Sequence, residues 1–459
     1  MLDLFEELVS SSRIKFGEVR WEETHTLSLV IEDGRIESVN SAIRSGIAMR
    51  VLKKGGWSFA SLTNGGREQI KRLWKNLEST GELLPGNSRI FSLSPVRETK
   101  RHAVKEDFRR INFKEKSETL KNLEGAARKR KGIVHTRLVY GESWLKETVI
   151  NSLGFRVEQE LPRIRVFLNV VAEKDGLKQS SYKSRAALGG WEIVRELREE
   201  SFPLPVADRA VELLDASPPP SGMFKVIISP QVAGILAHEA LGHNLEGDHI
   251  IHGQSLLKDK TGERIGSECI TLVDDATYPA AYGSYYFDSE GVPAQKKTLV
   301  ESGKVCGFLH SLETAALMEA YPTGNGRAQD YHHLPLVRMS NTLFSPGECS
   351  VEELMDMVGE GILVEELGSG GYVSPESGQF MFNIDSSWWV EKGKKKKLLR
   401  NVSLSGFTLE TLFKVKACSR AHTLSESGGT CGKEGQGVPV DDGGPFMFVE
   451  GMLVGGREK

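Results

Sequence analysis

The stretch Ser217-Pro-Pro-Pro-Ser-Gly222, followed directly by Met223-Phe-Lys-Val-Ile-Ile-Ser229, divides the chain into two parts. Three consecutive prolines cannot continue a helix, and they favour an extended linker. The apolar run after them predicts a buried strand, and the segment from Pro230 to about His243 predicts a helix with proline in its first turn. We therefore place one domain over residues 1–217 and a second over residues 223–459.

The first domain alternates between strand and helix patterns. Period-2 segments separated by Asp33-Gly34 and by Gly46 predict antiparallel hairpins. Apolar residues at helical spacing predict helices, and further alternating segments predict strands. The predicted strands cover 26–32, 35–40, 48–52, 57–61, 133–140 and 163–171, and the predicted helices cover about 2–11, 67–79, 103–131 and 203–214. This order is typical of a mixed α+β domain.

The second domain is rich in glycine. The chain has 48 glycines, and 32 of them follow Pro220. Short strands with glycine turns are predicted around 297–309 and 379–391, and helical segments near 311–319 and 350–358. The fold class is therefore α+β, with a Gly-rich, mainly antiparallel β domain that carries the 230–243 helix.

Charge and composition exclude several classes of protein. The 459 residues include 59 Lys and Arg and 62 Asp and Glu, a net charge of −3, with 39% hydrophobic and 26% charged residues. A nearly neutral chain has no electrostatic reason to coat nucleic acid or an anionic membrane. The acidic start does not resemble a secretory signal, and no window approaches the ~18–20 apolar residues of a membrane helix. We expect a cytoplasmic protein, with the run Lys392–Lys397 as a solvated hairpin turn rather than a nucleic-acid patch.

The cysteines are few, and all lie after the proline linker: Cys269, Cys306, Cys349, Cys418 and Cys431. An odd and sparse set does not form a disulfide scaffold. Each is therefore a small buried residue, a metal ligand or a nucleophile.

The chemistry centres on His238-Glu-Ala-Leu-Gly-His243 at the end of the predicted helix. The familiar zinc-peptidase spacing is H-E-x-x-H, which puts two imidazoles on one helix face. Here the spacing is one residue longer, and at 3.6 residues per turn the two side chains point about 140° apart. They can bind one ion only if the helix widens or ends, and Gly242 is a residue that tolerates a π-bulge or a break.

A catalytic zinc needs a third protein ligand. Candidates close in sequence are Glu246, Asp248, His249 and His252. A remote candidate is Cys431, which four glycines surround within four residues. The residues alone leave this choice open.

Several segments in order resemble the TldD/PmbA family, specifically its HExxxH-bearing TldD type. They are His238–Asp248, Thr271–Thr277, Asp288–Gln295, Pro322–Arg327, His333–Pro335, Arg338–Thr342 and Cys431–Val440. The resemblance is strong from about 224 to 456 and looser in the first domain, at Gly46–Arg50 and Trp57–Ala60.

The resemblance implies a metallopeptidase that cleaves unfolded or modified peptides. It implies Zn²⁺ bound by His238, His243 and Cys431, with Glu239 as the general base. It also implies a dimer, either with a paralogous PmbA-type subunit that lacks the motif or with a second copy. No nucleic-acid or membrane partner is implied.

Two alternatives accompany this hypothesis. The chain can be a non-catalytic peptide-binding subunit of such a complex, or a nucleic-acid-associated regulator that uses the lysine run, which the charge balance disfavours. One departure from the family pattern is Asp441-Asp442, where a Gly-Gln-Pro-like stretch is usual. This difference adds two acids near the expected site.

Overall fold

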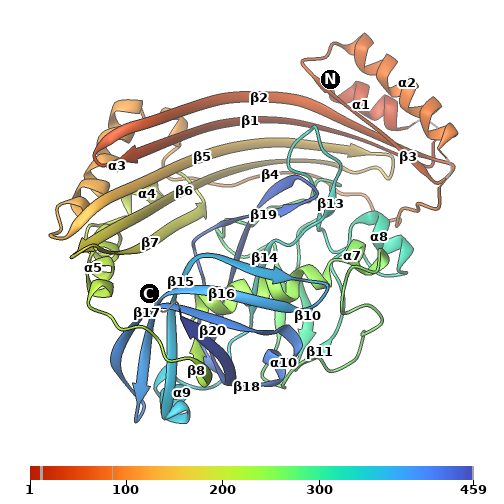
Figure 1. Cartoon of the computed structure of the whole chain (residues 1–459). Coiled ribbons are helices and arrows are strands. Elements are labelled where there is room, and N and C mark those ends of the chain that lie inside the picture. Colours follow the sequence, from red (N-terminus) through yellow and green to blue (C-terminus); the bar gives the residue numbers. More distant parts are fainter. Residues whose placement is uncertain (11–13, 85, 457–459) are drawn as a thin grey trace.

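Two large sheets make up the protein, one from each side of the proline linker. In the computed structural model, residues 1–10, 14–84 and 86–456 are described. A seven-stranded sheet forms an arch over an eleven-stranded sheet (Figure 1). The fold class is α+β, as predicted, and the structure of the second part is mainly antiparallel β.

Long strands build the first sheet, in the order β3-β2-β1-β5-β6-β4, with β7 also paired to β6. Asp33 and Gly34 have φ of 48° and 80° and form the predicted turn between β1 and β2. The strands are β1 (Phe16–Glu32), β2 (Arg35–Lys53), β3 (Gly56–Thr63), β4 (Arg97–Arg101), β5 (Ile133–Asn151), β6 (Arg156–Lys174) and β7 (Leu177–Leu188).

Gly46 does not separate two strands, so that prediction was wrong. It lies inside β2 opposite Glu22 of β1. A Cβ at this position would lie 2.2 Å from the ring of Tyr331. The glycine therefore permits close packing against a ring from the second part of the chain, a contact that sequence-local patterns do not reveal.

Helices flank the first sheet at both ends (Figure 1). They are α1 (Leu2–Val9), α2 (Arg67–Leu83), η1 (Phe108–Arg110), α3 (Phe113–Arg128), α4 (Glu192–Arg195) and α5 (Pro203–Leu214). The predicted helix over 103–131 is shorter, because the Asn112 side chain accepts a hydrogen bond from the Glu115 N–H at 2.9 Å and caps α3 there. The end of the predicted 2–11 helix falls outside the described residues.

The second sheet contains a closed ring of five strands, β8-β20-β17-β16-β15, in which β15 pairs back with β8. The pairing is antiparallel except between β15 and β8 and between β14 and β20. Residues 379–391, where short strands are predicted, form one strand of 13 residues. The strands are β8 (Gly222–Ile228), β9 (Leu272–Asp275), β10 (Lys296–Glu301), β11 (Lys304–Val305), β14 (Asn341–Phe344), β15 (Glu360–Ser374), β16 (Gln379–Glu391), β17 (Lys394–Phe407), β18 (Val415–Leu424), β19 (Gly429–Lys433) and β20 (Gln436–Gly456), and β12 (Gly326–Arg327) pairs with β13 (Leu336–Val337).

A broken helix follows β8 and packs into the core of the second part. The Ser229 side chain accepts from the Val232 N–H and caps α6 (Pro230–Ile235), as expected for serine before a proline-initiated helix. The other helices here are η2 (Leu236–Leu241), η3 (Gly242–Leu245), α7 (Gly247–Ile251), α8 (Leu312–Leu317), α9 (Val351–Val358) and α10 (Thr408–Phe413).

The lysine run lies on a hairpin, as predicted. Lys392 and Gly393 have positive φ and turn the chain from β16 into β17. Lys394 to Lys397 are exposed along the start of β17. Among the described helices, none has the length and apolar character needed to cross a membrane.

Candidate metal centre

The helix that carries the motif changes its pitch where the two histidines lie. His238 is in the π-helical turn η2, and His243 is in the 3₁₀ turn η3 that follows. Hydrogen bonds from i to i+5 bring residues five apart to one side of the helix. The two imidazole centroids lie 5.2 Å apart. The predicted widening of the helix is therefore present.

Gly242 has a different role from the predicted one. Its φ of −59° and ψ of −47° are ordinary helical angles, so its backbone needs no special freedom. A Cβ on this residue would lie 2.2 Å from the Met339 sulfur and 3.0 Å from the Ala237 carbonyl oxygen. Glycine is required here for close packing.

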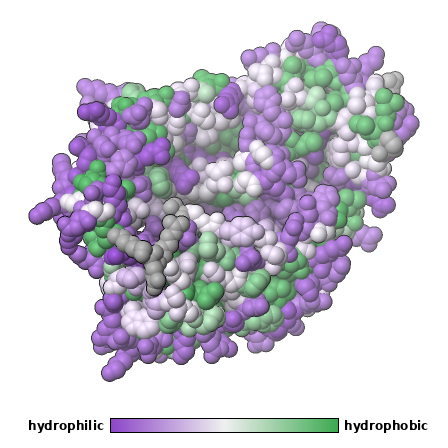
Figure 2. Space-filling view, in the orientation of Figure 1, coloured by the Kyte–Doolittle hydropathy of each residue, from purple (hydrophilic) through white to green (hydrophobic). Residues whose placement is uncertain are grey.

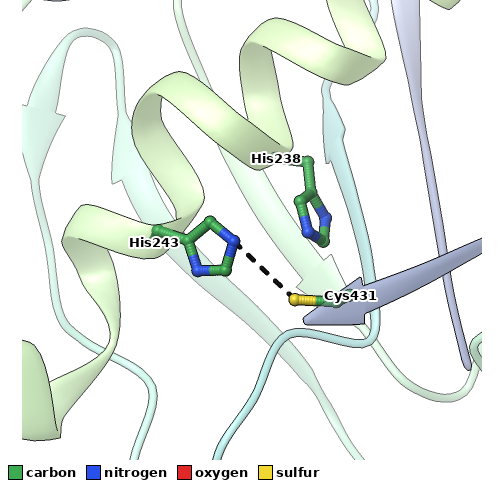
Figure 3. A group of neighbouring side chains, drawn as sticks. All are labelled: His238, His243 and Cys431. Carbon is green, nitrogen blue, oxygen red and sulfur yellow. Dashed lines mark hydrogen bonds between the residues drawn. The ribbon is translucent and has the colours of Figure 1, made fainter. Parts of the chain in front are cut away.

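Cys431 reaches the two histidines from a distant part of the chain. It lies in β19, opposite Val438 in the hairpin that β19 forms with β20. Its Sγ is 3.7 Å from Nε2 of His243, and the ring of His238 points toward the same sulfur (Figure 3). All three side chains are buried, and one ligand atom from each lies within 4.8 Å of the others.

Two buried arginines hold the cysteine hairpin. Arg338 donates to the carbonyl oxygen of Cys431 and, at 3.3 Å, to that of Gln436. Arg327 donates to the carbonyl oxygen of Pro439 at 2.7 Å. The backbone of the hairpin is thus fixed by side chains that sequence reasoning did not assign. Their segments belonged to the family resemblance, but nothing local indicated that these arginines reach the cysteine hairpin.

The four sequence-local candidates do not join the His–His–Cys group. Glu246 is fully buried and lies behind His243, where its Oε2 is 3.1 Å from Nδ1 of the imidazole. His249 bonds through Nδ1 to the carbonyl oxygen of His243 at 2.9 Å. Asp248 lies with Glu246 and His249 in a second group, and His252 is exposed after α7. Glu246 and His249 therefore contact His243 from behind, whereas Asp248 and His252 make no hydrogen bond to it.

Lys433 links Glu246 and Asp248 to the β19–β20 hairpin through ion pairs. Its Nζ lies 3.0 Å from Oε2 of Glu246, 2.7 Å from Oδ1 of Asp248 and 3.1 Å from the Val337 carbonyl oxygen. The ammonium is buried, with 5% of the side chain exposed. Because Lys433 is two residues after Cys431, the ion pairs join the strand that carries the thiol to the turn that carries His243. Sequence reasoning missed this residue, since its burial depends on the tertiary fold.

The two histidines favour the thiolate form of Cys431. Burial raises the pKa of the Cys431 thiol, but the imidazoles of His238 and His243 outweigh burial and lower it to about 5. Burial also raises the pKa of the Glu246 carboxyl, whereas His243 and Lys433 lower it to about 2. A thiolate is the form of cysteine that binds metals.

Acidic side chains lie next to this group. Glu239 has 40% of its side chain exposed, and its Oε2 is 3.7 Å from Nε2 of His243. Asp442 is partly buried, and burial together with Asp441 raises its pKa to about 7, while His238 lowers it. Of the two acids that depart from the family pattern, Asp442 therefore interacts with the motif, whereas Asp441 accepts a hydrogen bond from the Ser425 hydroxyl at 2.8 Å.

The donor set fits a zinc-like ion. Two ligands at about 2.1 Å (nitrogen) and 2.3 Å (sulfur) from one tetrahedral ion lie about 3.6 Å apart. The 3.7 Å between His243 Nε2 and Cys431 Sγ matches this value. Nδ1 of buried His238 has no hydrogen-bond partner among the described atoms, so the protein itself leaves one nitrogen of this imidazole unsatisfied.

Comparison with known proteins gives the family to which this chain belongs. Three consecutive segments match the domains of one family: PmbA/TldA metallopeptidase domain 1 over 17–79, the central domain over 106–217 and the C-terminal domain over 221–456. The chain belongs to the PmbA/TldA family of metallopeptidases.

Individual relatives agree with this assignment. The chain is 37% identical to Metalloprotease MJ0996 of Methanocaldococcus jannaschii, with 94% of each chain covered. It is 36% identical to a zinc metalloprotease TldD homolog of Saccharolobus solfataricus, over 54% of this chain and 55% of that one. The solved structure of TldE from Thermococcus kodakarensis has the same fold, with a TM-score of 0.78, 21% identity and coverage of 99% and 100%.

Proposed function

We propose that the protein is a zinc-dependent peptidase in which His238, His243 and Cys431 hold the ion and Glu239 is the general base. The observation that carries the proposal is the buried His–His–Cys group, whose members come from segments 188 residues apart and lie beside a water-accessible carboxylate. The zinc-named relative supports the choice of ion.

The proposed ion, Glu239 and Glu246 have separate roles in peptide hydrolysis. When bound, zinc supplies a Lewis acid that polarises a carbonyl and lowers the pKa of water. Glu239 lies on the open side of His243, where it can accept a proton from the attacking water and pass it to the leaving amine. Glu246 accepts the Nδ1 hydrogen of His243 and keeps Nε2 free for the ion.

The proposed substrate is an unfolded or modified peptide that binds as an added strand. Among the described strands, β19 pairs with β20 and with no other. Its second edge lies next to Cys431 and can accept main-chain hydrogen bonds with little sequence preference. A paralogous PmbA-type subunit or a second copy remains the proposed partner, and light scattering with and without that subunit checks it.

Two variants test the assignment. Glu239→Gln should keep stoichiometric zinc and lose cleavage of an unstructured peptide, whereas Cys431→Ser should lose the zinc. Cys418→Ser is the matched control, because Cys418 is also buried but lies in β18 outside the His–His–Cys group. Full activity of the Glu239 variant would refute the role of the base. Zinc without any cleavage in the unmodified protein would favour a non-catalytic peptide-binding subunit.

A further inference from the structure

A large groove on the first sheet faces the second part of the chain. It has a volume of about 980 Å³ and is lined by residues of β1, β2, β5 and β6 together with Tyr282. Figure 2 shows a recess between the arched sheet and the lower part of the molecule on the visible face. Thr26, Ser28 and Ser143 contribute hydroxyl groups to the lining.

All charged side chains of the groove except one are arginines. Arg44 of β2, Arg137 of β5, and Arg163 and Arg165 of β6 all line it. None of the ion pairs found within 1–10, 14–84 and 86–456 includes any of these four arginines. The one acid in the lining is Glu142, and Lys116 neutralises it at 2.6 Å.

Neutral acceptors hold two of these arginines without removing their charge. Arg163 donates to the carbonyl oxygens of Tyr282 at 2.8 Å and Ser284 at 2.7 Å. Burial and Arg327 lower the pKa of Arg163 to about 10, so it is charged at neutral pH. Arg165 donates to the Ser184 hydroxyl at 3.2 Å. Arg44 and Arg137 are exposed.

The groove continues toward the cysteine hairpin. A second cavity of about 210 Å³ shares Ser143, Arg163 and Tyr282 with it, and this cavity reaches Val438 and Pro439. Val438 lies opposite Cys431 in the β19–β20 hairpin. The groove therefore adjoins a smaller cavity that reaches the strand paired with β19, and Glu22, Glu147 and Asp288 also line that cavity.

We propose that this arginine groove is a specificity site that selects peptides with acidic residues beyond the segment to be cleaved. The proposal rests on the proposed peptidase function and names its substrate class. Charge complementarity commits the groove to an anionic segment. Arg44 and Arg137 expose guanidinium groups that have no carboxylate partner among the described residues and can bind carboxylates through paired N–H groups, while Arg163 and Arg165 add positive charge beside them.

Direct binding tests the groove without cleavage. Fluorescence anisotropy of the full-length Glu239→Gln protein is measured with three unstructured Gly/Ser peptides of one length that carry Glu, Gln or Lys at the same positions. The Glu peptide should bind most tightly and the Lys peptide most weakly. The preference should shrink at high salt, since exposed charges are screened.

Arginine variants test whether the preference for the Glu peptide arises in the groove. Arg44→Gln combined with Arg137→Gln should weaken binding of the Glu peptide by about three- to tenfold, the effect of losing two exposed charge pairs, and should weaken the Gln peptide less. Arg67→Gln combined with Arg72→Gln on α2 is the control, because these arginines are exposed but lie outside the groove. The control should bind as the parent protein does.

Several outcomes overturn the proposal. They are equal affinity for the three peptides, a groove variant that binds like the control, or tighter binding of single-stranded DNA of the same formal charge. Failure of the peptidase assignment is separate, because it would show as cleavage by the Glu239 variant or as absence of zinc, while these affinities are still measured.

Discussion

Lys433→Met tests whether the buried lysine holds the cysteine hairpin to the motif. The substitution keeps most of the side-chain volume but leaves the fully buried Glu246 carboxylate without its ammonium partner. Removing one partner of a buried ion pair costs about 3–5 kcal/mol. We expect a loss of about 3 kcal/mol, the lower end, because His243 still contacts Glu246 and the Asp248 side chain is 15% exposed to water.

The pH dependence of this loss has a defined sign. The pKa of Glu246 is about 2 in the folded chain against an ordinary value of 4.5. Its partners therefore stabilise the fold fully above pH 4.5, and this stabilisation disappears as the pH falls toward 2. The difference between the variant and the parent protein should be greatest at neutral pH and should shrink in acid.

Urea unfolding of the metal-free full chain, followed by the fluorescence of its seven tryptophans, two of which lie in β16, measures the free energy of unfolding. Lys416→Met is the control, because Lys416 pairs with Glu450 at a similar 2.8 Å but both side chains are about half exposed. The control should lose about 0–1 kcal/mol. A Lys433 variant that loses no more than this, or that loses as much in acid as at neutral pH, would refute the reasoning.

Three further predictions concern the same centre. Glu246→Gln should weaken zinc binding by about 10–100-fold in a chelator competition, because the carboxylate orients His243; unchanged affinity would contradict this. Asp442→Asn should stabilise the protein above pH 7 and have little effect below pH 4. The ionised carboxylate destabilises the fold, and this cost grows as the pH rises from the ordinary pKa of 3.8 to the folded-state pKa of about 7. Thermal unfolding at both pH values checks this. Gly242→Ala should lower the thermal midpoint and the zinc affinity, since its Cβ meets the Met339 sulfur, and Met339→Ala in the same chain should restore part of the loss.

Local patterns in the sequence determined many elements of this fold. The helix predicted over 203–214 coincides with α5, and the Asp33-Gly34 turn joins β1 to β2. The spacing of His238 and His243 required a distorted helix, and η2 is one. In each of these cases residues within a few positions of one another, through caps, turn angles and periodicity, decide the structure.

Strand length was predicted less well. Segments expected over 133–140 and 163–171 are parts of β5 and β6, each of 19 residues. Alternation indicates a strand only where one face is apolar and the other polar. Beyond residue 140, β5 buries polar residues such as Glu142, Glu147 and Thr148, which interrupt the apolar alternation, and its pairing with β6 continues past the visible pattern.

The sequence alone determined the α+β class, the helix that bears the motif and, through resemblance, the family. The resemblance also implied Cys431 as the third ligand, and the structure brings Cys431 rather than Glu246, Asp248, His249 or His252 to the histidines. Tertiary structure alone decided that Lys433 is buried between two carboxylates and that arginines of three strands share one groove. These contacts join residues up to 188 positions apart. They depend on which strands pair and which faces become buried, and those outcomes follow from burial of the whole chain rather than from local propensity.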